Sequence, residues 1–480
     1  MPRHQVPPSE TPPSSIHAHE RSLVPAGTST GLPLMAQRVR RLEETLMAAL
    51  DRWGYQEIIP PTFEYLDVLS AGLEPELIEH CYKFADRATG RILLLRPDVT
   101  AQIARIVAMG MLDPGLPLRL CYRTTVFRYE PEHAARDREI FQVGAELIGM
   151  DDVVTDGEIL ALMVECLKEL GLPAFRISLG HVGFFKELLA RTGMSLEGKK
   201  RAEQAAARKD LPRLEEVLRA ERLPKKLAHG ILEAPGLYGR EEVLKRGRVL
   251  AGGHRELVAA LDRLEQVYQL LVANGMKEHL VLDLGEFRGF DYYDGIAFDV
   301  FAEGVGYELG GGGRYNHLIG RFGRPLPSTG FAFDVDRLFQ ALEKLEEGTL
   351  GGHVDVLVSA PERAADRLFQ VAGLLRASGL RVVQGVPRGR GADPVGAAME
   401  EGRRILAAAV VVLVAPKIPS DEALVVLFGQ AGGGGQEALR RGTGHRGARK
   451  RRPTRPRQKP VKIKELPSWL GRALNRSRST

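Results

Sequence analysis

One strand-like segment, IFQVGAELIG at 140–149, carries an amide and a carboxylate four residues apart. Side chains alternate across a strand, so Gln142 and Glu146 share one face with Gly144 between them, and the large apolar residues take the other face. The glycine leaves a gap, and an amide beside a carboxylate suits the ammonium group of a small ligand. An ordinary exposed strand face would show the same spacing, so both interpretations stay open.

The preceding strand and the loop after it are rich in charge. Arg128 and Glu130 fall on one strand face, and Arg136 and Arg138 lie in the adjoining loop. Guanidinium groups bind carboxylates and phosphates through two parallel hydrogen bonds, so these cations could converge on an anion. Solvated surface arginines are the alternative interpretation.

Two further motifs combine residue types that rarely stand together. RGFDYYDG at 288–295 places two tyrosines beside an arginine and two acids, which favours the lining of a pocket. GGGGRY at 310–315 resembles a phosphate-binding loop, but no Lys-Ser/Thr follows it, so we predict a close-packed turn. No Cys/His spacing typical of a metal site and no nucleophile elbow occurs, so we expect no metal and no other cofactor.

Regular elements must position these residues, and the spacing of apolar residues marks several of them. Apolar residues recur at three- and four-residue steps over 34–53, which predicts an amphipathic helix that ends at a glycine. A second helix over about 100–109 has Asp98 placed to cap its start. Residues 118–130 and 139–148 read as two strands of a long hairpin, and a further helix follows over 159–170.

The later part of the chain falls into an insertion, a return to strands and a second domain. Helical spacing of aliphatic residues over about 185–280 predicts a mainly helical insertion. Strands return at LVLDLGEF and IAFDVF, and helices with mainly antiparallel strands in this order indicate an α+β fold. After a Gly-rich linker at 346–353, the order β-α-β-α-β-β over 354–438 predicts a small C-terminal α/β domain. The apolar run 405–415 within it suits either a buried strand or a buried helix.

Charge is distributed unevenly along the 480 residues. The net charge is +6, but residues 440–480 hold 15 Lys and Arg against one acid, so the first 439 residues carry −8. We therefore expect a disordered polar leader over 1–24, a main domain over 25–345 and a basic disordered tail over 439–480, which alone could bind polyanions. The three cysteines lack disulfide or metal spacing, and no apolar run is long enough to cross a bilayer, so we expect a cytoplasmic protein.

Five segments occur in the order found in the catalytic core of histidyl-tRNA synthetases: LRPDVT (95–100), VFRYE…REIFQVGAELIG (126–149), RGFDYYDG (288–295), GGRYNHLI (312–319) and TGFAFDVDRL (329–338). Over roughly residues 25–345 the chain thus resembles this class II family, whose core is an antiparallel sheet flanked by helices. Several sequence segments, LDLGEFRG and PSTGFAFDVDRL among them, look more like those of one branch of this family. That branch lacks synthetase activity and consists of the regulatory subunits of ATP phosphoribosyltransferase. The C-terminal domain resembles the anticodon-binding fold in its order of elements.

The resemblance implies a pocket for histidine. In it the α-ammonium group would be held by Asp98, Thr100, Gln142 and Glu146, the imidazole side would be lined by Tyr292 and Tyr293, and the carboxylate would face Arg288. Acids and amides bind a cation and a guanidinium binds a carboxylate, so each assignment also fits the chemistry of the residue. The family usually has Glu where Asp98 stands, so we expect that contact to be longer or bridged by water.

The resemblance extends to the nucleotide side of the synthetase pocket. The residues that match the synthetase positions holding ATP are Arg128, Glu130, Arg136 and Arg337. The loop among them differs, because it reads Pro131-Glu132-His133 and then Ala135 where a synthetase has Arg-Pro-Gln and then a glycine. An added acid and a lost glycine weaken the binding of phosphates, so we interpret this set as the remnant of a nucleotide pocket.

These features together predict a protein without chemistry of its own, required for the first step of histidine biosynthesis. It would assemble with a short-form catalytic subunit of ATP phosphoribosyltransferase and bind L-histidine as the effector of feedback control. The resemblance also implies self-association as a dimer, and we expect no contact with membranes and none with nucleic acid except through the basic tail. The rival interpretation is an active histidyl-tRNA synthetase, which adenylates histidine and charges tRNA.

Overall fold

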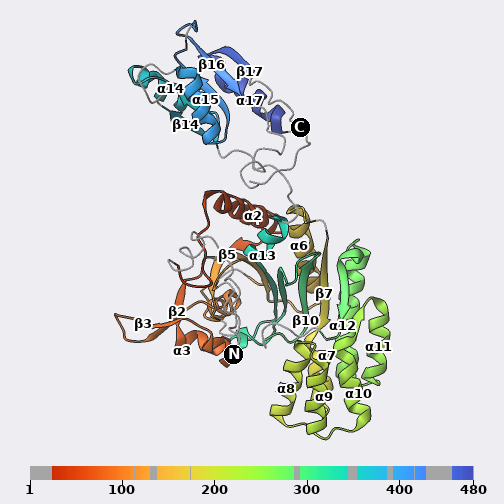
Figure 1. Cartoon of the computed structure of the whole chain (residues 1–480). Helices are drawn as coiled ribbons and strands as arrows, with labels where there is room; N and C mark the ends of the chain where they lie inside the picture. The colour runs from red at the N-terminus through yellow and green to blue at the C-terminus, as the bar shows by residue number, and fades with distance from the viewer. Residues whose placement is uncertain are drawn as a thin grey trace, which may run out of the picture. The chain divides into compact units, whose positions relative to one another are not determined.

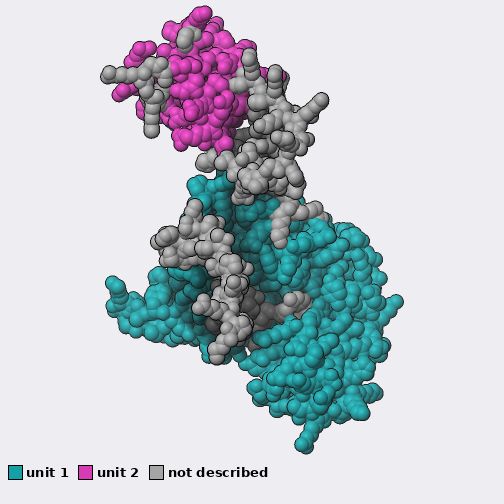
Figure 2. Space-filling view, in the orientation of Figure 1, with its two compact units in different colours: residues 1–345 teal, residues 346–480 magenta. Residues whose placement is uncertain are grey.

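The computed structural model describes residues 24–111, 115–129, 138–172, 174–285, 292–343, 354–385, 393–415, 417–428 and 457–478. The chain divides into unit 1, residues 1–345, and unit 2, residues 346–480, which are coloured separately in Figure 2. Residues 1–23 of the expected leader and the whole expected linker at 346–353 lie outside the described residues.

Unit 1 is built on a nine-stranded sheet. Across the sheet the strands follow the order β1 (Gln56–Glu57), β5 (Leu118–Phe127), β6 (Glu139–Ile148), β12 (Ser328–Asp334), β11 (Gly310–Arg314), β10 (Ile296–Ala302), β7 (Phe175–His181), β9 (Leu280–Asp283) and β8 (Tyr238–Gly239). The pairs β1–β5 and β7–β9 are parallel and the others are antiparallel. The predicted α+β class with a mainly antiparallel sheet is confirmed.

Helices α2 (Pro33–Arg52), α6 (Val153–Glu169), α12 (Arg255–Ala273) and α13 (Val335–Glu343) share the main core of unit 1 (Figure 1). In this core the apolar stripe of α2 meets the alternate residues Val143, Ala145 and Leu147 of β6, which are fully buried. The predicted apolar face of β6 is thus confirmed.

Asp152 and Thr155 form a capping box at the start of α6, so this helix begins earlier than the spacing of its apolar residues predicts.

The other residues of β5 and β6 belong to a second core on the opposite face. Leu120 and Tyr122 of β5 pack there against α5 (Val99–Ala108) and the short 3-10 helix η4 (Ile319–Phe322). Asp98 caps α5 as predicted, because its carboxylate accepts hydrogen bonds from the first free N–H groups of the helix. The cap fixes the start of α5 above this face of the sheet.

The predicted helical insertion consists of α7 (Val182–Ala190), α8 (Leu196–Ala207), α9 (Leu211–Ala220), α10 (Lys225–Glu233) and α11 (Glu241–Ala251), followed by α12. Figure 1 shows these helices together, in yellow and green.

A small sheet of β2 (Phe63–Tyr65), β4 (Ile92–Leu95) and β3 (Lys83–Ala85) lies between α2 and α5 in the chain, together with α3 (Leu66–Leu69) and α4 (Pro75–Glu79). Within the described part of the chain, no helix has the length and apolarity to cross a membrane.

The predicted turn at GGGGRY is wrong, because residues 310–314 form β11 in the middle of the sheet. Four glycines disfavour a strand by themselves, but here the neighbouring strands approach so closely that only glycine fits. A Cβ atom on Gly312 would lie 2.1 Å from the carbonyl oxygen of Gly330, and one on Gly310 would lie 2.3 Å from that of Ala332. The prediction of close packing holds, and that of a turn does not.

Unit 2 contains a five-stranded sheet with the order β14 (Val382–Gly385), β13 (Val354–Ser359), β15 (Ala407–Val412), β16 (Glu422–Leu427) and β17 (Arg457–Lys462). Its helices include α14 (Ala365–Ala377), α15 (Pro394–Arg404) and α17 (Leu466–Arg478). The predicted α/β domain and its order of elements are confirmed, and the ambiguous apolar run holds the buried strand β15.

The expected disorder of the whole tail over 439–480 is wrong for residues 457–478. There β17 pairs with β16, and α17 buries Leu466, Leu470 and Leu474 in the core of unit 2. The three leucines recur every four residues and so lie on one face of a helix, which the dense positive charge around them concealed. The predicted limit of this domain at residue 438 is therefore too early.

Candidate functional site

The candidate site lies on the face of the sheet that carries α5. Glu146 of β6 is paired with Gly330 of β12, which is paired with Gly313 of β11, so these three residues share that face. A Cβ atom on Gly330 would lie 1.8 Å from Oε2 of Glu146, and one on Gly313 would lie 2.9 Å from the ring of Tyr293. The glycines therefore make the space that the carboxylate and the tyrosine occupy.

Glu146 lies at the centre of this floor. It is 1% exposed, and the hydroxyl of Thr100 donates a 2.7 Å hydrogen bond to its Oε1 while the hydroxyl of Tyr315 donates to its Oε2. Burial raises the pKa of Glu146 to about 8, although the two hydrogen bonds act in the opposite direction. A cationic ligand would restore the charged form, so the site is built to gain from a positive group.

A second buried acid, Asp98, stands at the start of α5. Its carboxylate accepts hydrogen bonds from the backbone N–H of Thr100 at 3.3 Å and from that of Ala101 at 3.2 Å. Burial raises the pKa of Asp98, whereas the positive charge of Arg128 and these backbone N–H groups lower it. Asp98 and Glu146 thus flank Thr100, and each charge makes ionisation of the other costlier.

Three tyrosines form an aromatic wall beside the acids. The ring centroids of Tyr292 and Tyr293 lie 4.9 Å apart, and that of Tyr315 lies 5.7 Å from Tyr292. Burial raises the pKa of Tyr292 and Tyr315 well above the ordinary value, so both remain neutral phenols. Edge-to-face rings with hydroxyl groups suit a flat heterocycle whose nitrogens can form hydrogen bonds.

Gln142 and Arg337 form a second, adjoining network. The side-chain nitrogen of Gln142 donates to Oδ1 of Asp334 at 3.0 Å, and Oδ2 of Asp334 lies 3.2 Å from Nε of Arg337. Nη1 of Arg337 also lies 2.6 Å from Oε1 of Glu308. Gln142 therefore shares the face of Glu146 but bonds to a different acid, and Arg337 already has anionic partners.

The structure thus brings five predicted residues together in one place: Asp98, Thr100, Glu146, Tyr292 and Tyr293. Arg128 lies next to them, because its Nε donates a 2.7 Å hydrogen bond to the carbonyl oxygen of Pro97. The predictions for Arg288, Glu130 and Arg136 concern residues outside the described part of the chain.

Our sequence analysis missed Tyr315, Asp334 and Glu308 as members of these networks. Tyr315 follows β11 directly, and the strand assignment that would have placed it was obscured by the four glycines. Asp334 ends β12 and Glu308 precedes β11, and neither stands in a sequence pattern that marks it as a member of a site. Their partners come from distant parts of the chain, which spacing along one segment does not reveal.

The arrangement can bind an ammonium group and an aromatic heterocycle at the same time. The two buried acids and the hydroxyl of Thr100 are groups that bind a cation, and the tyrosine rings offer an aromatic surface. Among the described residues here, we find no side chain placed as a nucleophile with an adjoining base.

Comparison with known proteins agrees with this geometry. The profile of the histidyl-tRNA synthetase family matches residues 27–338. The ATP phosphoribosyltransferase regulatory subunit of Geobacter metallireducens is 35% identical over 403 residues, which cover 84% of this chain and 92% of that protein. The protein of the same name from Moorella thermoacetica is 40% identical over 360 residues, covering 75% of this chain and 91% of that one.

Solved structures give the same result. A structure from Bacillus halodurans, described as an ATP phosphoribosyltransferase regulatory subunit/histidyl-tRNA synthetase, is 27% identical with a TM-score of 0.71 and covers 81% of this chain and 97% of that one. Histidyl-tRNA synthetase from Nostoc is 18% identical with a TM-score of 0.72, covers 94% and 99%, and supports the fold alone. The chain therefore belongs to the histidyl-tRNA synthetase family, within the branch of ATP phosphoribosyltransferase regulatory subunits.

Proposed function

We propose that this chain is the non-catalytic, histidine-sensing subunit of an ATP phosphoribosyltransferase complex. It assembles with a short-form catalytic subunit, which condenses ATP with phosphoribosyl pyrophosphate, and L-histidine is its effector. The α-ammonium group of histidine binds between Asp98 and Glu146 beside Thr100, and the imidazole ring lies against the tyrosines. Gln142 and Arg288 complete the pocket, the first near the ammonium group and the second at the carboxylate.

The contact between Thr100 and Glu146 carries this proposal. A buried carboxylate with two hydroxyl donors and a second acid nearby is costly to keep without a cation. Free histidine offers that cation, and it offers a ring for the adjoining tyrosines. The effector acts on the partner only if its affinity differs between two states of the complex, so the pocket must change with the state of assembly.

Titration calorimetry of the purified chain with L-histidine tests the pocket. We expect saturable binding in the wild type, and a loss of at least tenfold in affinity in Glu146→Ala and Asp98→Ala, because each variant removes a charged hydrogen-bonding partner of the ligand. Glu216→Ala is the matched control, since this carboxylate is 62% exposed on α9 and lies in the insertion. No heat with the wild type would refute the pocket.

Feedback is tested in the complex reconstituted with the catalytic subunit. Glu146→Ala and Asp98→Ala are expected to abolish inhibition by histidine while the complex still forms, which size-exclusion chromatography checks. Unchanged inhibition in both variants would contradict the assignment of the effector site.

Histidine-dependent exchange of pyrophosphate into ATP separates this proposal from the rival synthetase activity. We expect no exchange by the isolated chain, because Arg337, which matches a nucleotide-binding residue of synthetases, is paired with Glu308 and Asp334. A clear exchange activity would overturn the proposal in favour of a synthetase.

A further inference from the structure

The turn between α11 and α12 sets the position of His254. Gly252 and Gly253 have φ angles of 57° and 80°, in the left-handed region that glycine adopts without strain. The backbone N–H of His254 donates a 2.9 Å hydrogen bond to the carbonyl oxygen of Ala251, so the residue is held directly before α12. Its side chain forms no capping hydrogen bond, so the imidazole takes no part in starting the helix.

Two carboxylates lie beside the imidazole of His254. Oε2 of Glu256, in the first turn of α12, lies 3.1 Å from Nδ1 of this histidine, and Oε1 of Glu187, near the end of α7, lies 3.9 Å from it. One atom from each of the three side chains lies within 4.8 Å of the other two. Because α7 and α12 pack against each other, three potential metal ligands from distant parts of the chain meet at one point.

Nδ1 of His254 is not satisfied by these neighbours alone. The atom is shielded from solvent, and within the described chain it forms no hydrogen bond, since the approach of Glu256 at 3.1 Å does not have the direction of one. A shielded polar atom without a partner is unfavourable. A metal ion held between this nitrogen and the two carboxylates would be such a partner.

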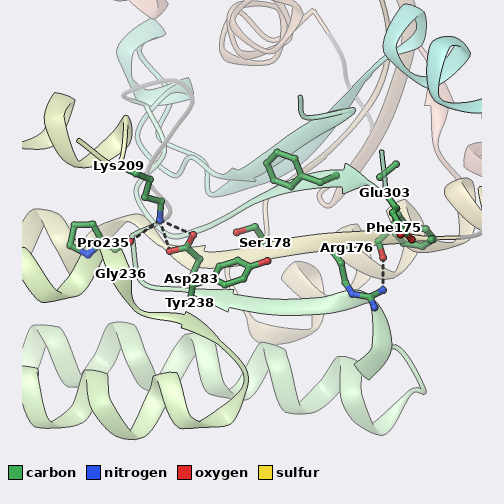
Figure 3. A pocket seen from close by; sticks show the side chains of 12 residues that line it. Phe175, Arg176, Ser178, Lys209, Pro235, Gly236, Tyr238, Asp283 and Glu303 are labelled. Carbon is green, nitrogen blue, oxygen red and sulfur yellow. Dashed lines mark hydrogen bonds and ion pairs between the residues drawn. The ribbon is translucent and has the colours of Figure 1, made fainter. Parts of the chain in front are cut away.

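The two carboxylates also lack a basic side chain. Among the described residues, neither Glu187 nor Glu256 forms an ion pair with a lysine or an arginine. Glu187 stands in the last turn of α7, where the helix dipole disfavours a negative charge. Figure 3 shows the contrasting case, in which Nζ of Lys209 in the insertion lies 3.0 Å and 2.9 Å from the two carboxylate oxygens of Asp283. A metal ion would supply to Glu187 and Glu256 the positive charge that Lys209 supplies to Asp283.

The distances suit a small transition-metal ion. Zn²⁺ binds imidazole nitrogen and carboxylate oxygen at about 2.0–2.2 Å, which places neighbouring ligand atoms of a tetrahedral ion about 3.3–3.6 Å apart. The distances of 3.1 Å and 3.9 Å from Nδ1 lie on either side of this separation, so small rotations of the side chains reach it. An imidazole ligand favours Zn²⁺ and related ions over Mg²⁺ and Ca²⁺, which prefer oxygen ligands.

We propose that Glu187, His254 and Glu256 bind a divalent transition-metal ion such as Zn²⁺, which joins the first helix of the insertion to α12. The three side chains are 29%, 32% and 61% exposed, so an ion can reach them from solvent. The inference does not depend on the proposed function, because none of these residues belongs to the histidine pocket. The sequence alone predicted no metal, since close Cys/His spacing is missing and Glu187 is far from His254 along the chain.

Titration calorimetry with Zn²⁺ tests the site in the purified chain after treatment with EDTA and dialysis. We expect saturable binding in the wild type, and an affinity at least tenfold lower in His254→Ala and in Glu187→Gln, because each variant removes one of three ligands. Glu256→Gln should have the same effect. This side chain is mostly exposed, so its replacement leaves the packing of the helices intact.

His229→Ala is the matched control. This exposed histidine of α10 is near Glu233, a carboxylate that already pairs with Arg246, so the variant should not change the affinity for Zn²⁺. Thermal unfolding gives a second measurement and checks that each variant folds. Zn²⁺ should raise the Tm of the wild type and of His229→Ala but not that of the three ligand variants, and Mg²⁺ should give no rise that depends on His254.

Equal affinity for Zn²⁺ in the wild type and the three ligand variants would overturn this inference and show that His254 pairs with the two acids as an imidazolium. A rise in Tm with Mg²⁺ that the same variants lose would also contradict it, because the site would then not prefer metals that bind imidazole. Weaker binding of Zn²⁺ confined to the three ligand variants supports it, whatever the outcome of the histidine titrations.

Discussion

The binding of histidine should release a proton from Glu146. In the empty site this carboxyl has a pKa raised to about 8 by burial, so it is mostly protonated at pH 7. An ammonium group placed against it favours the carboxylate and lowers that pKa. Binding therefore expels the proton, and affinity must rise with pH until the empty site is itself ionised.

The size of the effect follows from the pKa. A group with a pKa of 8 is protonated to roughly 0.9 at pH 7, 0.5 at pH 8 and 0.1 at pH 9, so about 0.9 proton per histidine is released at pH 7 and about 0.5 at pH 8. Below pH 8 the affinity should increase up to about tenfold per pH unit.

Calorimetry in buffers of different ionisation enthalpy measures the released protons directly. Thr100→Val serves as the control, because it removes a hydrogen bond that lowers the pKa of Glu146, so its release at pH 8 should exceed that of the wild type. A release near zero at pH 7, with histidine bound, would show that Glu146 is already ionised or does not meet the ammonium group, and would refute the reasoning.

Three further predictions concern packing around the site and in unit 2. Gly330→Ala, whose Cβ would lie 1.8 Å from the carboxylate of Glu146, should lower histidine affinity at least tenfold in calorimetry, while Gly306→Ala, with no atom within 4 Å, should not. Arg314→Met removes one of the two arginines paired with the buried Asp156, the other being Arg263, and should lower the free energy of unfolding by about 1–3 kcal/mol in denaturant titration, against under about 1 kcal/mol for the exposed Arg213→Met. Leu470→Ala should cost about 2–5 kcal/mol in the same assay, because this leucine of α17 is fully buried.

The parts of the fold that the sequence predicted correctly depend on local signals. The carboxylate of Asp98 caps α5 through the N–H groups of residues two and three positions further along, so this cap can be read directly from the sequence. The alternation in β6 likewise identifies the face of Glu146 before any partner is known. The face of the sheet that carries the candidate site was therefore predictable.

The parts that failed depend on contacts from elsewhere in the chain. Four glycines have little tendency to form a strand, and β11 exists because the backbones of β10 and β12 pair with it on both sides. In α17 the high density of Lys and Arg suggested disorder, although Leu466, Leu470 and Leu474 were spaced for one helical face. The basic composition of the tail as a whole concealed the four-residue spacing of these leucines.

The nucleotide side shows why a match in residue type does not establish a retained activity. Arg337 stands where a synthetase arginine holds ATP, and its presence alone suggests an intact pocket. In this chain its guanidinium lies 2.6 Å from Glu308 and 3.2 Å from Asp334, and Asp334 also accepts the hydrogen bond of Gln142. A phosphate would have to displace two carboxylates that already pair with Arg337. The hydrogen bonds of the phosphate to this arginine do not offset the loss of both ion pairs unless further cations contribute. The presence of Arg337 is thus explained by its pairing within the fold, whereas the burial of Glu146 beside Asp98 calls for a positive group and supports a ligand on the histidine side.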